Sequence, residues 1–81
     1  EYLKAGERER AIGALRESVA SDPQYSAAWK ALGRALAESG REDEAHAAWT
    51  SGIAAAQAKG DKQAEKEMAV FARRVRKKRG A

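Results

Sequence analysis

The chain has 81 residues, of which 43% are hydrophobic and 35% charged, and it carries a formal net charge of +4. This length suits one small domain, which excludes a large enclosed active-site cavity. The sequence contains no Cys, which excludes disulfides, thiolate metal sites and thiol nucleophiles. With many Ala residues and a single Pro, the composition favours helices over strands and predicts an all-α domain.

The N-terminal part is predicted to contain the end of one helix and the whole of a second. Residues 1–5 resemble a helix end closed by Gly6, since Gly suits the left-handed conformation that closes helices. From residue 7 to residue 20, apolar residues recur at spacings of one, three and four, which is the pattern of an amphipathic helix. Its apolar stripe consists of Ala11, Ile12, Leu15 and Val19.

A further helix is predicted over residues 24–39, after a turn around Pro23. Pro disfavours helix in the residue before it and is tolerated in the first turn of the next helix, where Asp22 or Ser21 can act as the cap. Gly40 is expected to end this helix. Its buried side carries Ala28, Trp29, Leu32 and Leu36.

The next helix is predicted over residues 41–59, with three acidic residues in its first turn that favour the positive end of the helix dipole. Its expected buried stripe consists of Ala45, Ala48, Trp49, Gly52, Ile53 and Ala56. Gly33 and Ala45 are small, so the two helices are expected to approach closely there, with larger apolar side chains filling the surrounding space.

The last predicted helix runs from residue 62 to residue 78 after a break at Gly60, and Asp61 is its expected N-cap. Its packing face consists of Ala64, Met68, Phe71, Ala72 and Val75. At helical spacing, Met68 and Phe71 indicate core packing rather than contact with a cofactor.

Two segments of the chain become similar when one is shifted by 34 residues, so that Gly6 falls on Gly40 and Ala11 on Ala45. The period resembles the tetratricopeptide repeat (TPR), whose pattern is a Trp, a Leu-Gly pair, a Tyr, then Ala-x-x-x-Phe and a final Pro. One copy carries Trp29, Leu32, Gly33, Leu36 in place of the Tyr, Ala45, and Trp49 in place of the Phe. The preceding copy carries only Tyr2, Ala11, Leu15 and Pro23.

The resemblance implies an all-α, right-handed α-α superhelix of antiparallel helix hairpins. It divides a single domain into a partial repeat, a complete repeat, and a C-terminal capping helix with a basic tail, over residues 1–25, 26–59 and 60–81. Gln57 stands where the family has Pro, so the helix before it is expected to run on to residue 58 or 59. Because such arrays usually need about three repeats, we expect the exposed face of residues 1–20 to be covered by a front segment that is absent from this sequence or by a partner chain.

The resemblance also implies a non-catalytic interaction module that binds a peptide or protein through its concave face. The expected residues of that face are Lys4, Ala27, Lys30, Ala31, Arg34, Ala37 and Glu38. Lys30 and Arg34 are similar to the basic pair of the carboxylate clamp in chaperone-binding TPR proteins, which points to an acidic peptide. The clamp also needs Asn side chains, and this sequence has none. Three interpretations stay open: a true clamp, groove cations that weakly favour acidic peptides, and plain solvated charges.

Two alternative functions concern other surfaces of the chain. Residues 73–81 hold six Lys/Arg and no acid, namely Arg73, Arg74, Arg76, Lys77, Lys78 and Arg79. These cations suit a salt-dependent contact with RNA or an anionic surface, and they equally suit a solvated helix end. No aromatic residue follows Phe71, so we do not expect specific nucleic-acid binding. The second alternative is a homo-oligomer, in which the face of residues 1–20 pairs with another copy.

The sequence offers no catalytic constellation and no metal-ligand cluster, so we expect neither enzyme activity nor a cofactor. His46 is the only His, and it is expected to be a half-buried packing residue. No apolar run is long enough to span a membrane, and the first residues do not resemble a signal sequence. The expected localisation is the cytoplasm, although a segment before Glu1 could carry targeting information.

Overall fold

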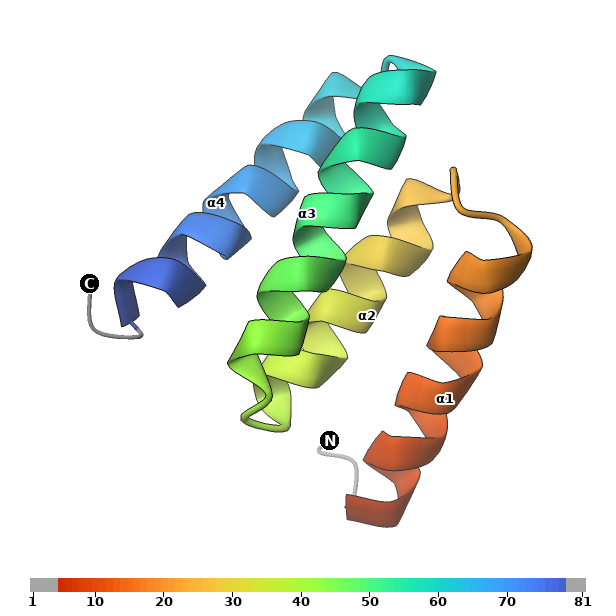
Figure 1. Ribbon diagram of the computed structural model, residues 1–81, viewed down its shortest axis with the longest axis vertical. Coiled ribbons are helices and arrows are strands. Elements are labelled where there is room, and N and C mark those ends of the chain that lie inside the picture. The colour runs from red at the N-terminus through yellow and green to blue at the C-terminus, as the bar shows by residue number, and fades with distance from the viewer. Residues whose placement is uncertain (1–4, 79–81) are drawn as a thin grey trace.

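The computed structural model describes residues 5–78, with side chains described for residues 6–75. Within that range the chain forms four helices and no strand. The helices are α1 (Ala5–Ser21), α2 (Ser26–Glu38), α3 (Glu42–Lys59) and α4 (Lys62–Lys78). They lie side by side in chain order, each antiparallel to the one before it (Figure 1). The predicted all-α architecture of antiparallel hairpins is confirmed.

The structure corrects the predicted start of α1. Gly6 is the second residue of this helix and has no left-handed backbone, so it does not close a preceding helix. Glycine adopts right-handed and left-handed conformations with similar ease, so a Gly near a boundary does not by itself mark a helix end. Residues 1–4 lie outside the described residues, and the helix end predicted there stays a prediction.

α2 begins at Ser26, two residues later than predicted. Asp22 organises the preceding turn instead of capping the helix. Its Oδ1 accepts a hydrogen bond from the Gln24 N–H at 3.3 Å, and its carbonyl accepts one from the Tyr25 N–H at 3.0 Å. Aspartate often bonds its own backbone two residues further on, and this turn holds Pro23 outside the helix.

α2 and α3 end with the same backbone motif, each at a glycine. Gly40 and Gly60 have φ angles of 78° and 76°, which residues with a Cβ rarely adopt. In each case the next N–H donates to the carbonyl four residues before the glycine, at 2.9 Å after α2 and 2.8 Å after α3. This is the Schellman motif. The predicted ends are confirmed, α3 runs to Lys59 as expected, and Asp61 caps α4 by accepting the Ala64 N–H at 3.1 Å.

The α2–α3 hairpin contains two reciprocal contacts between a glycine and a tryptophan. A Cβ placed on Gly33 of α2 would lie 2.5 Å from Cδ1 and Cε2 of Trp49 on α3. A Cβ placed on Gly52 of α3 would lie 2.6 Å from the Cβ of Trp29 on α2. Both separations are shorter than van der Waals contact, so only glycine fits without movement. The predicted close approach at Gly33 is confirmed, and Gly52 provides a second one.

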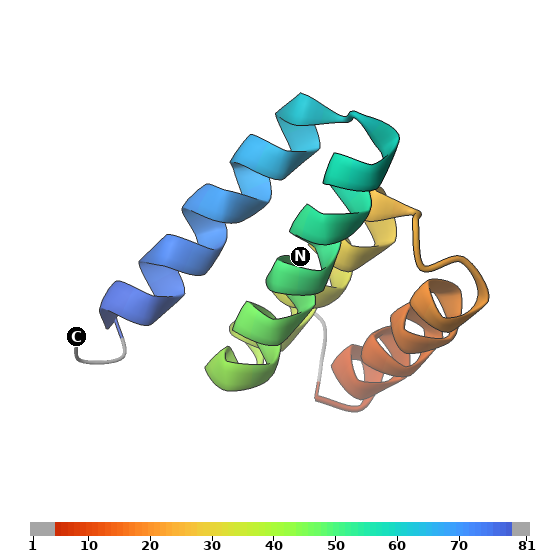
Figure 2. The ribbon, with the colours of Figure 1, turned by 45° about the horizontal axis from the view of Figure 1, so that its top comes forward.

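The outer helices pack at the two ends of the row (Figure 2). α1 packs against α2 and buries Ile12 and Val19. α4 packs against α3, and Met68 is fully buried there. Among the other described side chains of α4, Ala64, Ala72 and Val75 are buried, and Phe71 is partly buried against the core. The predicted packing face of α4 is confirmed.

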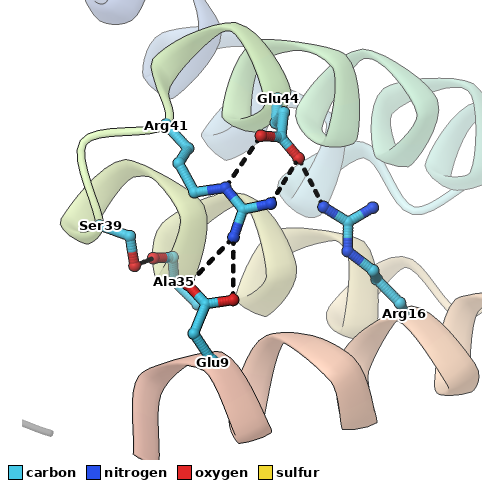
Figure 3. A network of polar contacts seen from close by, with 6 residues as sticks. All are labelled: Glu9, Arg16, Ala35, Ser39, Arg41 and Glu44. Atoms are coloured by element: carbon cyan, nitrogen blue, oxygen red, sulfur yellow. Dashed lines mark hydrogen bonds and ion pairs between the residues drawn. The ribbon is translucent and has the colours of Figure 1, made fainter. Parts of the chain in front are cut away.

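A polar network joins α1 to the start of α3 (Figure 3). The Arg41 guanidinium donates to both carboxylate oxygens of Glu9 at 3.1 Å and to Glu44 at 2.9 and 3.0 Å. Arg16 of α1 also donates to Glu44, at 2.6 Å. The hydrogen bonds from Arg41 and then Arg16 hold the pKa of Glu44 below its usual value. Helical spacing does not predict this network, because the residues that it joins across the fold lie 28 and 32 positions apart.

Candidate functional site

A groove runs along one face of α2 and is bounded by α3 and α4. Its volume is about 730 Å³. α2 supplies Ala27, Lys30, Ala31, Arg34, Ala37 and Glu38, α3 supplies Trp49, and α4 supplies Glu67 and Phe71. The α2 residues recur every three or four positions, which places them on a single helix face. Anything that fills the groove therefore contacts α2 along most of its length.

The residues of α2 that were predicted for the concave face all line this groove. Lys4 lies outside the described residues, so its place on that face stays a prediction. Three lining residues do not follow from the sequence. Trp49 and Phe71 are predicted as core, because helical spacing indicates burial but not which core residues border a groove. Glu67 has no sequence signal, since its partner Lys30 lies 37 positions away.

Two aromatic rings form the apolar floor of the groove. The centroids of the Trp49 and Phe71 rings lie 5.3 Å apart, and their planes are tilted by 43°. Trp49 is only 4% exposed, and its Nε1–H donates to the Lys30 carbonyl at 3.3 Å. Because Gly33 lacks a side chain, the indole fits against the α2 backbone. The floor is therefore held in place before any partner binds.

A salt bridge links α2 to α4 within the groove lining. The Lys30 Nζ lies 2.7 Å from the Glu67 Oε1, and each side chain is 39% exposed. The hydrogen bond from Lys30, followed by its positive charge, holds the pKa of Glu67 below its usual value. Within α2, the Arg34 Nε lies 3.3 Å from the Glu38 Oε2. Lys30 and Arg34, the predicted groove cations in the part of the chain that the structure describes, therefore each already have a carboxylate partner.

Comparison with known proteins places this arrangement in a family. Residues 2–65 match the sequence profile of the family described as tetratricopeptide repeat. The chain belongs to the TPR family. It is 51% identical over 74 residues to the TPR repeat-containing protein PA0015 of Pseudomonas aeruginosa, a match that covers 91% of this chain and 70% of the relative.

A solved structure has a similar fold. The chain resembles the solution structure of protein BPP2914 from Bordetella parapertussis, with a TM-score of 0.78 and 45% sequence identity over 88% of this chain. The match spans 62% of the length of the Bordetella protein. The TPR-like fold expected from the sequence is thereby confirmed.

The family assignment indicates the general role of the chain. TPR repeats generally mediate protein–protein interactions, and they are typically non-catalytic scaffold modules. An acidic partner, self-association and the division into a partial repeat, a complete repeat and a cap all stay predictions.

Of the remaining candidate residues, Arg73, Arg74 and His46 do not line the groove. Arg73 and Arg74 are exposed on α4, while the side chains of Arg76, Lys77, Lys78 and Arg79 fall outside the described residues. Contact with a polyanion therefore stays a prediction. His46 is half-buried on α3, as predicted. Among the described residues, no group of three or more His, Cys, Asp or Glu side chains is placed to hold a metal ion. None of the helices in that range is both long and apolar enough to cross a membrane.

Proposed function

We propose that this TPR chain is a protein–protein interaction module whose groove binds a segment of a partner protein. One observation carries the proposal: the face of α2 predicted to be concave lines a groove whose floor consists of Trp49 and Phe71. Aromatic side chains that become buried at an interface contribute a large share of its binding energy, and the partly buried Phe71 offers more such surface than the 4% exposed Trp49. The segment is expected to lie along α2, with its apolar side chains directed toward the two rings.

Small side chains on α2 leave room for such a segment. Ala27 and Ala31 are exposed and one helical turn apart, and both line the groove. A helix or an extended strand of the partner can approach these methyl groups closely. A bulky apolar side chain of the partner can then cover the rings of Trp49 and Phe71. Because Trp49 is already held against Gly33 and the Lys30 carbonyl, little of the interaction energy is spent on ordering its ring.

A displayed library of random peptides, selected on the immobilised chain, tests the proposal. Selected peptides are titrated against Ala31→Arg, which places a long charged side chain in the groove. The matched control is Ala54→Arg, at an exposed position of α3 outside the groove lining. We expect Ala31→Arg to weaken binding at least roughly tenfold and Ala54→Arg to change it less than about twofold.

Two checks make the outcome decisive. Circular dichroism with thermal melting establishes that both variants keep the fold. Sedimentation across a range of concentrations shows whether a second copy of the chain occupies the groove, in which case Ala31→Arg would abolish self-association. A library that yields no binder, or peptides that bind both variants equally, would contradict the proposal.

A further inference from the structure

We infer that Glu67 sets the charge preference of the groove by occupying Lys30, so that the groove accepts an uncharged apolar segment and discriminates against an acidic one. The inference rests on the proposed function and specifies the chemistry of the partner. It assigns a specificity role to a residue of α4, whereas the concave-face residues expected from the repeat pattern in the described part of the chain lie on α2.

The position of the Glu67 carboxylate is the first support. It lies 2.7 Å from the Lys30 Nζ, which is the length of a charge-assisted hydrogen bond. A carboxylate of an incoming partner would have either to displace Glu67 from Lys30 or to bind Lys30 beside Glu67, next to a second negative charge. The side chains of Lys30 and Glu67 are each 39% exposed, whereas those of Arg34 and Glu38 are 78% and 52% exposed. The Lys30–Glu67 pair is therefore less solvated than the Arg34–Glu38 pair. Displacing Glu67 from Lys30 thus has the larger effect on the binding free energy.

The charge balance of the lining is the second support. Among the residues that the structure describes, the groove lining carries two cations and two carboxylates, and each cation is paired. An acidic partner would exchange one carboxylate for another at Lys30 and place its own charge beside Glu67. An uncharged segment leaves both pairs intact and covers the rings of Trp49 and Phe71. The groove is thus complementary to an apolar segment without carboxylates.

Two synthetic peptides test this inference by isothermal titration calorimetry. The first is an Ala- and Gln-based helical host that carries Phe and Leu on one face, and the second has two of its Gln residues replaced by Glu. Each is titrated against the unmodified chain, against Glu67→Gln and against Glu65→Gln. Glu65 lies on the same helix but outside the groove lining, where its Oε2 accepts a hydrogen bond from Gln57 Nε2 at 3.0 Å. It therefore controls for the change in net charge.

The expected result is a shift in preference confined to one variant. The unmodified chain binds the uncharged peptide more tightly than the acidic one. Glu67→Gln raises the affinity for the acidic peptide relative to that for the uncharged peptide by about fivefold, while Glu65→Gln changes this ratio by less than about twofold. In the double variant Lys30→Met, Glu67→Gln, the gain for the acidic peptide disappears, because Lys30 is the group that is unmasked.

Other outcomes separate the inference from the proposed function. Tighter binding of the acidic peptide to the unmodified chain, or equal shifts in Glu67→Gln and Glu65→Gln, overturns the inference and leaves the groove as a binding site. Failure of both peptides to bind, when the displayed library yields groove binders, also overturns the inference alone. Failure of the library together with both peptides removes the proposed function as well.

Discussion

Gly33 links the packing of the α2–α3 hairpin to the shape of the groove. The space left by its missing side chain is filled by the Trp49 indole, which belongs to the core and also forms part of the groove floor. Close-packed interiors respond to a change of a single methyl group. A substitution at Gly33 therefore affects both the stability of the hairpin and the surface offered to a partner.

We expect Gly33→Ala to lower the free energy of unfolding by about 1–3 kcal/mol, because the added Cβ would overlap the Trp49 indole. Gly13→Ala is the matched control, since Gly13 lies within α1 and a Cβ there meets no atom within 4 Å. That substitution should raise the free energy of unfolding by about 0.5–1 kcal/mol, because Ala is the better helix former. Urea denaturation measures both changes. Similar values for the two variants would show that Gly33 is not a close-contact position.

Single residues differ in how far the sequence predicts their role. Gly33 is recognisable because it belongs to the Leu-Gly pair of the repeat, and the expectation of close packing there holds. The groove side of Trp49 is not recognisable, since the same periodicity describes a residue inside the core and one at its border. The pairing of Lys30 with Glu67 depends on how α2 and α4 are placed, and helical spacing contains no information about residues so far apart.

At the scale of the helices, α1 depends on fewer neighbours than α3. It packs against α2 alone, whereas α3 packs against both α2 and α4. The ion pairs of Arg41 with Glu9 and of Arg16 with Glu44 supply its other attachment. Surface ion pairs contribute little one at a time, but Arg41 and Glu44 are shared between pairs, which lowers the entropic cost of ordering each side chain.

Arg41→Met is expected to loosen α1 while the α2–α3 hairpin keeps its protection. The substitution removes the shared cation of the network, so amide hydrogen exchange in α1 should become several-fold faster, with little change in α3. Arg10→Met, an exposed position of α1 outside this network, controls for the loss of a positive charge. In about 1 M salt the difference between the two variants should shrink, since the screening length is then only about 3 Å. Uniformly faster exchange in all four helices would contradict this account.

The ends of α2 and α3 are better predicted than the start of α2. The ends at Gly40 and Gly60 follow from a local rule, since each glycine adopts the left-handed conformation of a Schellman motif. The start of α2 does not follow, because Asp22 is equally suited to cap a helix and to organise a turn. In this structure Asp22 organises the turn. The Trp29 Nε1–H donates to the Pro23 carbonyl at 2.7 Å, which links the turn to α2.

At the scale of the whole molecule, the stability of the fold is expected to fall in acid. Hydrogen bonds from basic side chains lower the pKa of Glu44 and Glu67 from the ordinary value of 4.5. The unfolded chain then binds protons at these sites more readily than the folded chain. Their stabilising contribution is complete above the unfolded-state pKa and is lost as the pH falls through the folded-state pKa.

The melting temperature should therefore be nearly constant from about pH 7 to about pH 5.5 and should decrease below about pH 4.5. The double variant Glu44→Gln, Glu67→Gln should show a shallower decrease, because its amides do not titrate. Thermal melts followed by circular dichroism across this range provide the comparison. Curves of equal steepness would assign the acid sensitivity to other carboxylates.

The uneven charge of the chain leads to a prediction about polyanions. Residues 73–81 hold six cations and no acid, so any contact with RNA should be nonspecific and sensitive to salt. In a gel-shift series, retardation of single-stranded RNA at about 50 mM salt should disappear by about 200 mM, for unrelated sequences alike. The variant Arg73→Gln, Arg74→Gln should weaken it, since both side chains are exposed. No retardation at the lowest salt would remove polyanion binding as a function.

The fold of the molecule is predicted well because the sequence patterns that indicate it are local to each helix and recur along the chain. Each helix has its own apolar stripe, and the 34-residue period brings Trp29, Gly33 and Trp49 into one recognisable pattern. The same pattern predicts the face of α2 that lines the groove. It cannot predict the contribution of α4, whose side chains enter the groove only through the packing of α4 on α3.

The two tryptophans donate their indole hydrogen bonds in different parts of the molecule. Trp29 bonds the Pro23 carbonyl in the turn after α1, and Trp49 bonds the Lys30 carbonyl beneath the groove. They are the only tryptophans in the sequence, so intrinsic fluorescence samples just these two places. In a Trp29→Phe variant, all tryptophan emission would arise from the groove floor, and a ligand over Trp49 would change its intensity or wavelength. The chain thus contains its own optical reporter of groove occupancy, which needs no added label.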